Sequence, residues 1–222
     1  MDSWYQENLV CPRDHLELFL ESDWLLCPNR HVYPIVDGIP VMLLSDVNQT
    51  MEIANYSLKR AFGEDVVDHR APELFLESLG VGEYEKLGII DLAKSPNRRI
   101  DPVVSYIIAA TNGMAYKGLR GALPYYPIPN LHLPEGHQQY LLDIGCSWGR
   151  WCIAAAHRGY KPIGIDPSLG AIMAANRVAR ELKLQVHYIV GDARFLPLKN
   201  LSIDRVFSYS VLQHGCRSHI DV

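Results

Sequence analysis

Residues 140–149 have the sequence Tyr140-Leu-Leu-Asp-Ile-Gly-Cys-Ser-Trp-Gly149, and this stretch decides the fold of the last third of the chain. Its first residues are mostly apolar and predict a short buried strand, while the small residues after them predict a tight turn. Apolar positions at helical spacing follow over residues 150–157, and Gly159 ends that predicted helix. We therefore expect a strand, a turn and a helix in direct succession.

Three more strands are predicted downstream. They span residues 161–165, 185–190 and 204–211, and an alanine-rich helix is predicted between the first two, over residues 168–183. Strands that alternate with helices at this spacing predict a parallel sheet with right-handed crossovers, hence an α/β fold with a Rossmann-like sheet. Ligands of such sheets bind at the carboxyl ends of the strands. Asp166 ends the second strand, seventeen residues after Gly149, where an acidic residue can bind ribose hydroxyls.

Three details separate the possible nucleotide ligands. The turn Gly145-Cys-Ser-Trp-Gly149 lacks the three glycines that bring a pyrophosphate onto a helix N-terminus, which disfavours a dinucleotide. The third strand ends in Gly191-Asp192-Ala193, followed by Leu196-Pro197-Leu198, and the fourth is Asp204-Arg-Val-Phe-Ser-Tyr-Ser-Val-Leu-Gln-His214. Over residues 140–214 the chain thus resembles the class I S-adenosylmethionine-dependent methyltransferases. It is most similar to the ubiquinone and menaquinone methyltransferase branch (methyltransferase type 11).

This resemblance implies a set of cofactor-binding residues. Asp143 and the turn would surround the methionine part and the sulfonium, Asp166 the ribose, and Asp192 the adenine amino group. Ser147 departs from the commoner glycine or asparagine, a change that a small side chain tolerates. The catalytic residue is unknown, and His214 is the candidate placed to act as a base. The implied cofactor-binding residues are Asp143, Gly145, Cys146, Ser147, Trp148, Gly149, Asp166, Pro167, Asp192 and Ala193.

A short repeat occurs near the N-terminus. Cys11-Pro-Arg-Asp-His15 and Cys27-Pro-Asn-Arg-His31 lie sixteen residues apart and share Cys-Pro-x-x-His. Two such turns suit a tetrahedral Zn²⁺ held by two thiolates and two imidazoles, so Cys11, His15, Cys27 and His31 are the candidate ligands. An alternating apolar stretch around Asp37-Gly38 then predicts a β-hairpin.

Residues 7–45 resemble the small zinc-ribbon family that includes the activator subunit of tRNA and protein methyltransferases. That family has Cys-x-x-Cys twice, whereas Asp14 and Arg30 stand at the second positions here. Two alternatives follow. Either the metal ligands have moved by one residue to His15 and His31, as in a related ribosomal-RNA guanine methyltransferase with an N-terminal zinc module, or an Asp14–Arg30 ion pair replaces the metal.

The chain divides into three segments by composition. We expect a zinc-ribbon-like module over residues 1–47, a helical linker or lid over residues 48–139, and the N-terminal part of the S-adenosylmethionine-binding domain over residues 140–222. In the middle segment, Asp101-Pro102 predicts the start of an apolar helix. Residues 1–50 carry a formal charge of −6 and residues 140–222 carry +4, within a net charge of −4.

Composition limits the functional classes. The chain has 222 residues, of which 48% are hydrophobic, with no basic-then-apolar signal sequence and no apolar stretch long enough to span a bilayer. Five dispersed cysteines predict a reducing compartment, and we expect a cytoplasmic protein. The acidic N-terminal segment has only Arg13 and Arg30 as basic residues, which argues against nucleic acid as a partner.

The predicted function is S-adenosylmethionine-dependent methyl transfer to a small-molecule or lipid-like acceptor. Alternatives are an RNA methyltransferase with a zinc-ribbon docking module, and a non-catalytic zinc-ribbon adaptor with a vestigial methyltransferase fold. About a dozen residues follow the fourth predicted strand, so we expect a C-terminally truncated fragment, or a protein partner that completes the sheet edge. The acceptor and the oligomeric state are not predicted.

Overall fold

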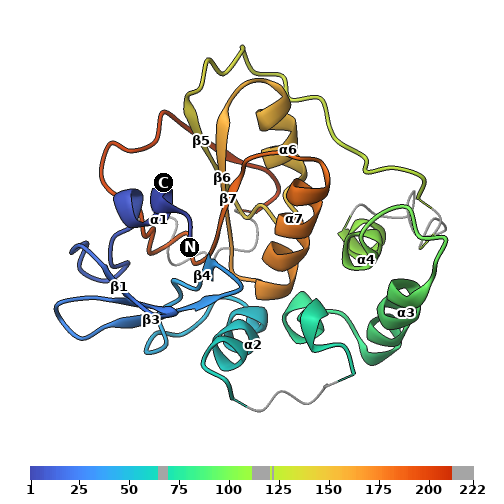
Figure 1. Cartoon of the computed structure of the whole chain (residues 1–222), viewed down its shortest axis with the longest axis horizontal. Helices are drawn as coiled ribbons and strands as arrows, with labels where there is room; N and C mark the ends of the chain where they lie inside the picture. Colours follow the sequence, from blue (N-terminus) through green and yellow to red (C-terminus); the bar gives the residue numbers. More distant parts are fainter. Residues whose placement is uncertain (65–69, 112–120, 122, 212–222) are drawn as a thin grey trace.

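In a computed structural model, two four-stranded sheets organise the chain, which is described over residues 1–64, 70–111, 121 and 123–211 (Figure 1). One sheet is antiparallel and lies near the N-terminus, with strand order β1-β2-β3-β4. The other is parallel throughout, with strand order β7-β6-β5-β8. The expected α/β fold with a parallel sheet is confirmed.

The parallel sheet follows the predicted alternation of strands and helices. Helices α6 and α7 are its crossover connections, and Gly149 and Ser168 are their N-caps. The strands are bounded as predicted to within three residues. The elements are β5 (Tyr140–Ile144), α6 (Arg150–His157), β6 (Lys161–Asp166), α7 (Leu169–Glu181), β7 (His187–Val190) and β8 (Arg205–Ser208).

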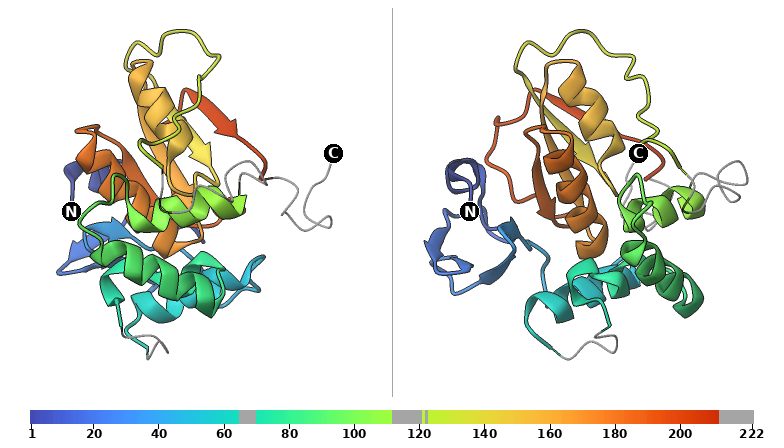
Figure 2. Two further views of the ribbon diagram at one scale, coloured as in Figure 1. Left: turned by 90° about the vertical axis from the view of Figure 1, so that its right-hand side faces the viewer. Right: turned by 45° about the vertical axis from the view of Figure 1, so that its right-hand side comes forward.

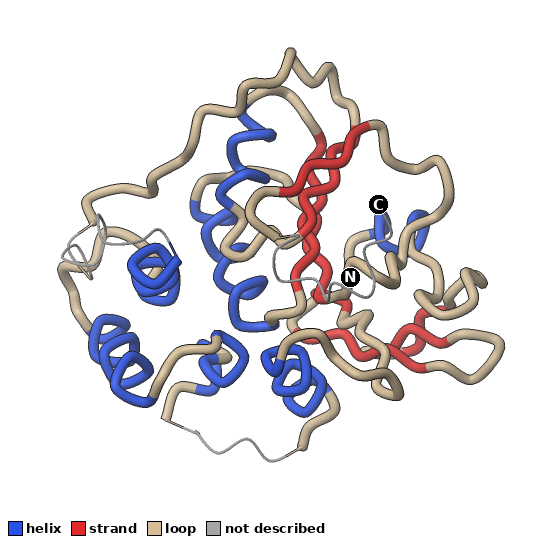
Figure 3. Tube along the Cα trace, turned by 180° about the vertical axis from the view of Figure 1, so that it is seen from behind, coloured by secondary structure: helices blue, strands red, loops and turns tan. Residues whose placement is uncertain are grey.

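The two faces of this sheet have different covers. Helix α7 packs against the face that carries Tyr188 and Val190. The opposite face carries Leu142, Ile163, Ile165 and Ile189, and it packs against the N-terminal segment instead. Figure 3 shows the strands of the parallel sheet between the helices and the small sheet. Because side chains alternate along a strand, burial on both faces requires the near-continuous apolar runs found in β6 and β7.

The N-terminal segment contains a short helix and the small antiparallel sheet. Between β3 and β4, Asp37 and Gly38 have φ of 48° and 81°, and such positive values at both residues are typical of the tight hairpin turn that Asp-Gly predicts. The elements are α1 (Ser3–Asn8), β1 (Phe19–Glu21), β2 (Trp24–Leu26), β3 (Val32–Val36) and β4 (Ile39–Pro40).

Backbone hydrogen bonds join the small sheet to the parallel sheet. Val41 forms a parallel bridge with Val190, and the Met42 N–H donates to the Val190 carbonyl at 2.7 Å. On α1, the Tyr5 hydroxyl accepts from the Tyr188 N–H and donates to the Tyr188 carbonyl, both at 2.9 Å. These contacts occupy the free edge of β7 and place the N-terminal segment firmly against the sheet.

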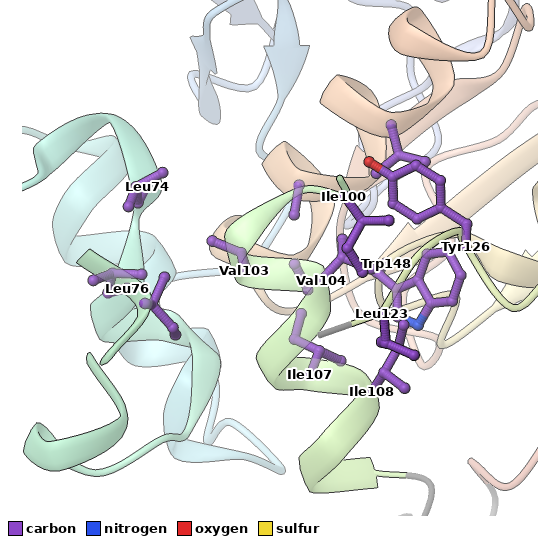
Figure 4. Close-up of a cluster of buried hydrophobic side chains, with 14 of the residues drawn as sticks. Leu74, Leu76, Ile100, Val103, Val104, Ile107, Ile108, Leu123, Tyr126 and Trp148 are labelled. Carbon is purple, nitrogen blue, oxygen red and sulfur yellow. The ribbon is translucent and has the colours of Figure 1, made fainter. Parts of the chain in front are cut away.

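The middle segment contains the predicted helices over residues 52–111; most of them pack against α7, whereas α3 packs against α4 (Figure 2). Asp101 caps α4 by accepting from the N–H groups of Val103 and Val104, at 2.9 and 3.1 Å, which explains the predicted helix start. Figure 4 shows the apolar side of α4 packed around Trp148. The elements are α2 (Glu52–Ala61), η1 (Pro72–Leu74), η2 (Leu76–Leu79), α3 (Glu83–Lys94) and α4 (Pro102–Thr111).

Two further points concern the whole chain. The division into segments 1–47, 48–139 and 140–222 stays a prediction about domains, although the first and last segments share one hydrophobic core. Among the described residues, no helix is both long and apolar enough to cross a membrane.

Candidate functional site

The turn after β5 is held in a tight left-handed conformation. Gly145 and Gly149 have φ of 72° and 79°, and Ser147 has φ of 49°. The N–H groups of Gly145 and Cys146 both donate to the Ile165 carbonyl, at 2.8 and 3.1 Å, so the turn is fixed against β6. The left-handed φ of Ser147 explains why glycine or asparagine is commoner at this position.

Asp166 lies at the carboxyl end of β6, directly beside this turn. Its Oδ2 accepts from the Ser147 N–H at 3.0 Å, and its Oδ1 accepts from the Ser168 N–H at 2.9 Å. Burial raises the pKa of Asp166, and these two backbone donors lower it in part. Each oxygen retains an acceptor position, so the carboxylate can accept further hydrogen bonds.

The carboxyl end of β7 completes the same edge. The Gly191 N–H donates to the Asp166 carbonyl at 3.1 Å, which brings Gly191 and Asp192 next to the first two strand ends. Asp192 is 9% exposed and forms an ion pair with Arg194 at 2.6 Å. Ala193 is exposed. Residues from three different strand ends therefore meet at one edge, as the sequence predicts.

Asp143 is the most buried carboxyl group of the site, with 1% of its surface exposed. Its pKa is raised to about 7, mainly by burial and less by the nearby charge of Asp166, although the hydrogen bond from the Cys152 thiol, at 3.4 Å from Oδ2, lowers it. The structure thus keeps a carboxyl group that titrates near neutrality beneath the turn.

Two of the predicted site residues direct their side chains away from this edge. Trp148 is 2% exposed and packs in the core with Tyr126, their ring centroids 6.1 Å apart (Figure 4). The Cys146 sulfur lies against Gly164, where an added Cβ would come within 2.7 Å of it. Both residues can meet a ligand only through their backbone. His214 lies outside the described residues.

Two buried serines of the middle segment also support the site, and sequence analysis missed them. The Ser57 hydroxyl donates to the Pro167 carbonyl at 2.7 Å and accepts from the Leu169 N–H at 2.9 Å. The Ser78 hydroxyl accepts from the Gly170 N–H at 2.7 Å. These contacts hold the segment that follows Asp166. A single serine within a predicted helix gives no sequence signal for such a role.

The chemistry of this edge favours a particular kind of ligand. Three carboxyl groups lie near adjacent strand ends: Asp143 one residue before the end of β5, Asp166 at the end of β6, and Asp192 two residues after the end of β7. The N–H groups at the start of the turn already donate to groups of the protein. Such an edge offers acceptors to the hydroxyl and amino groups of a ligand, and the N–H groups already bonded within the protein are not free to bind a phosphate.

A second cluster lies in the N-terminal segment. Ligand atoms of Cys11, Asp14, Cys27 and His31 all lie within 4.8 Å of one another. The Cys11 sulfur is 3.4 Å from His31 Nδ1, and the Cys27 sulfur is 3.4 Å from Asp14 Oδ1. Three of the four predicted ligands thus come together, but the fourth group is Asp14 instead of His15.

The position of His15 has a backbone cause. His15 has φ of 57° and is exposed, and its N–H donates to the Cys11 carbonyl at 2.9 Å, which closes the turn. The side chain one residue earlier faces the two thiols. Asp14 contacts His31 at 3.4 Å and Asn29 at 2.7 Å, and no Asp14–Arg30 ion pair occurs in the part of the chain that the structure describes.

Comparison with known proteins agrees with the parallel sheet. Residues 141–221 match the family described as "Methyltransferase domain". Ubiquinone biosynthesis O-methyltransferase of Azorhizobium caulinodans is 34% identical over 74 residues, or 33% of this chain and 29% of that protein. Sheet and match together define the last third of the chain as part of a class I, S-adenosylmethionine-dependent methyltransferase domain. The chain spans less than a third of the length of this curated relative.

A second relative is much shorter. A UPF0434 protein of Mannheimia succiniciproducens is 43% identical over 49 residues, which make up 21% of this chain and 80% of that protein, so the chain belongs to the UPF0434 family over that stretch. Among solved structures, magnesium protoporphyrin IX methyltransferase from Synechocystis PCC 6803 with bound S-adenosylmethionine matches at 19% identity and a TM-score of 0.33. That match covers 77% of this chain and 67% of that chain.

Proposed function

We propose that the chain binds S-adenosylmethionine at the carboxyl ends of β5, β6 and β7, as part of an enzyme that methylates a small organic acceptor. The observation that carries this proposal is the position of the Asp166 carboxylate between two elements. It accepts from the Ser147 N–H in the turn after β5 and from the Ser168 N–H at the start of α7. Asp166 thereby stands where a ribose would lie across the turn.

Each residue of the edge has a binding role in this proposal. Asp166 binds the ribose hydroxyls, Asp192 accepts from the adenine amino group, and the left-handed turn lies beside the methionine part. When bound, the cofactor supplies an electrophilic methyl group on a positively charged sulfur. The carboxyl group of Asp143 lies beneath the turn, and a positive charge placed at the turn would favour its ionised form. Methyl transfer needs mainly alignment and exclusion of water, so these residues bind and orient.

The relatives support a proposal about the acceptor. The A. caulinodans protein is named for O-methylation in ubiquinone biosynthesis, and the sequence motifs resemble the quinone methyltransferases. We therefore place the acceptor of this chain among small, partly apolar organic molecules. A protein partner at the edge of the sheet and a cytoplasmic location are part of the same proposal.

Calorimetry with the full chain tests cofactor binding. S-adenosylhomocysteine should bind the wild type, and Asp166→Asn should weaken binding about 10- to 100-fold because it removes charged hydrogen bonds. Asp204→Asn is the matched control, since Asp204 also accepts a backbone N–H, from Tyr140 at 2.8 Å, but at the amino ends of the strands. Absence of binding to the wild type would contradict the proposal.

We also propose that Cys11, Asp14, Cys27 and His31 hold a Zn²⁺ ion. A tetrahedral zinc with thiolate, imidazole and carboxylate ligands leaves its ligand atoms about 3.3–3.8 Å apart. The Cys11–His31, Cys27–Asp14 and Asp14–His31 separations are all 3.4 Å. Tyr33 supports the set, because its hydroxyl lies 3.1 Å from the Cys11 sulfur and can donate to it. The donor set therefore fits the ion.

Elemental analysis of the purified full chain tests the metal site. We expect zinc at about one equivalent in the wild type and its loss in Cys27→Ser and Asp14→Ala. His15→Ala is the matched control and should keep its zinc, because His15 is exposed outside the cluster. Zinc lost from His15→Ala but kept in Asp14→Ala would restore the ligand set with His15, and a metal-free wild type would exclude both sets.

A further inference from the structure

Arg194 binds the carboxylate of Asp192 from two sides. Its guanidinium donates to Asp192 Oδ2 through Nε at 2.9 Å and through Nη2 at 2.6 Å. Its backbone N–H donates to Asp192 Oδ1 at 2.9 Å. The plane of the carboxylate is therefore fixed by a residue only two positions further along the chain.

These contacts leave the carboxylate with little acceptor capacity. A carboxylate offers about four acceptor positions, two on each oxygen. Both positions of Oδ2 are taken by the guanidinium, and one position of Oδ1 is taken by the Arg194 N–H. One position on Oδ1 remains, and Asp192 can accept a single donor from a ligand in one direction.

The guanidinium is itself fixed by Asn48, directly after the N-terminal segment. Arg194 Nη2 donates to the Asn48 carbonyl at 2.9 Å, and its Cζ lies 5.3 Å from the centre of the Phe195 ring. Asn48 follows the stretch that pairs with β7 at Val190. The arginine therefore has hydrogen-bond partners on both sides and cannot turn without losing one of them.

We propose that Arg194, anchored by Asn48, is a positioning residue that makes Asp192 selective for the exocyclic amino group of adenine. Adenine presents an N–H donor at that place. Hypoxanthine presents a carbonyl oxygen there and an N–H one ring position away. A carboxylate that rotates freely could turn to accept from that displaced N–H. The Asp192 carboxylate cannot, because Arg194 occupies its Oδ2. This inference rests on the proposed cofactor site and assigns its base selectivity.

Binding of two matched ligands tests the proposal. S-adenosylhomocysteine and S-inosylhomocysteine differ at the 6-position of the base, and calorimetry with the full chain gives the ratio of their dissociation constants. We expect the wild type to prefer the adenosyl ligand about 10- to 100-fold. Arg194→Gln should lower this ratio to below about 3-fold. Arg194→Lys should give an intermediate ratio, because lysine keeps the positive charge but lacks the two planar N–H donors of the guanidinium.

Arg177→Gln is the matched control. Arg177, on α7, likewise donates two hydrogen bonds to a carboxylate, that of Asp101, at 2.7 and 3.2 Å. Its loss should leave the ratio unchanged, which separates selectivity from a general loss of stability. An unchanged ratio in Arg194→Gln, with the wild type still selective, would overturn the role of Arg194 alone. A wild type that binds neither ligand would overturn the proposed cofactor site and this inference together.

Discussion

The two sheets of this chain have four strands each, but they are stabilised in different ways. Strand β6 has four consecutive buried residues between Lys161 and Asp166, because side chains on both of its faces are covered. Strand β1 has no buried residue over Phe19–Glu21. The central strand β6 of the parallel sheet is thus buried on both faces, whereas β1 and Trp24 of β2, toward the outer edge of the small sheet, are exposed.

The exposed face of the small sheet carries large apolar side chains. Phe19, Trp24 and Val32 are 60%, 36% and 43% exposed, and all three belong to the face opposite the buried Leu25 and Tyr33. A sheet with so little buried surface needs support from its docking contacts with β7 and from the proposed metal ion. We therefore expect the order of the small sheet to depend on its contacts with the parallel sheet.

The largest expected effect lies in the core of the parallel sheet. Ile163 has no exposed surface and packs between β5, β7 and the N-terminal segment. Ile163→Ala should lower the free energy of unfolding by about 2–5 kcal/mol, because it removes buried methyl groups and leaves a cavity. Val32→Ala, on the exposed face of the small sheet, is the control and should cost below about 1 kcal/mol. Urea unfolding measures both, and equal costs would refute the contrast between the sheets.

The next effect concerns the contact between the sheets. Tyr5→Phe removes the hydroxyl that pairs with both the N–H and the carbonyl of Tyr188 on β7. The expected loss is about 1–3 kcal/mol, since both backbone groups are buried and would lose their partner. Tyr84→Phe is the matched control, because Tyr84 is 82% exposed and should change nothing measurable.

Hydrogen exchange would locate the effect of Tyr5→Phe. Faster exchange at the Tyr188 amide and across the small sheet, with little change in β5, is expected if docking on β7 stabilises the small sheet. Uniformly faster exchange throughout the chain would mean instead that both sheets unfold as one cooperative unit.

Local patterns made much of this fold predictable. Apolar runs identified the strands of the parallel sheet, Asp37-Gly38 predicted the hairpin, and Asp101-Pro102 predicted the start of α4. The same patterns identified the residues that meet at the strand ends. These signals are short in sequence, so each depends on neighbouring residues only.

Long-range contacts were not predictable in this way. Tyr5 and Tyr188 are 183 residues apart, and no local pattern connects them. The choice of Asp14 over His15 depends on a left-handed φ of 57° at His15, which a non-glycine residue rarely adopts. The role proposed for Arg194 could not be predicted, because it depends on a hydrogen bond to the Asn48 carbonyl, which is far away in the sequence.

A smaller effect links the parallel sheet to pH. Burial raises the pKa of Asp143 to about 7, above its value in the unfolded chain. Between the unfolded and folded values the folded state holds the extra proton, so the stability from this group falls as pH rises and levels off above about 7. From pH 6 to pH 8, wild type should lose about 1 kcal/mol more than Asp143→Asn.

The comparison with Asp143→Asn isolates this group. His187, on β7, titrates with the opposite sign, because burial lowers its pKa and its protonation opposes folding in acid. Its contribution is common to wild type and variant and cancels in the difference. Urea unfolding at several pH values measures it, and parallel curves for the two proteins would contradict a buried, neutral Asp143.

The smallest effect is expected at the surface of the small sheet. Arg13, in the first turn of the proposed metal site, forms an ion pair with Asp46, and their side chains are 34% and 67% exposed. Exposed pairs of this kind contribute about 0–1 kcal/mol and weaken in salt. A double-mutant cycle with Arg13→Gln and Asp46→Asn should therefore give a coupling below about 1 kcal/mol that shrinks as salt is added. A larger coupling that persists in salt would mean that this ion pair, more than docking and metal, orders the small sheet.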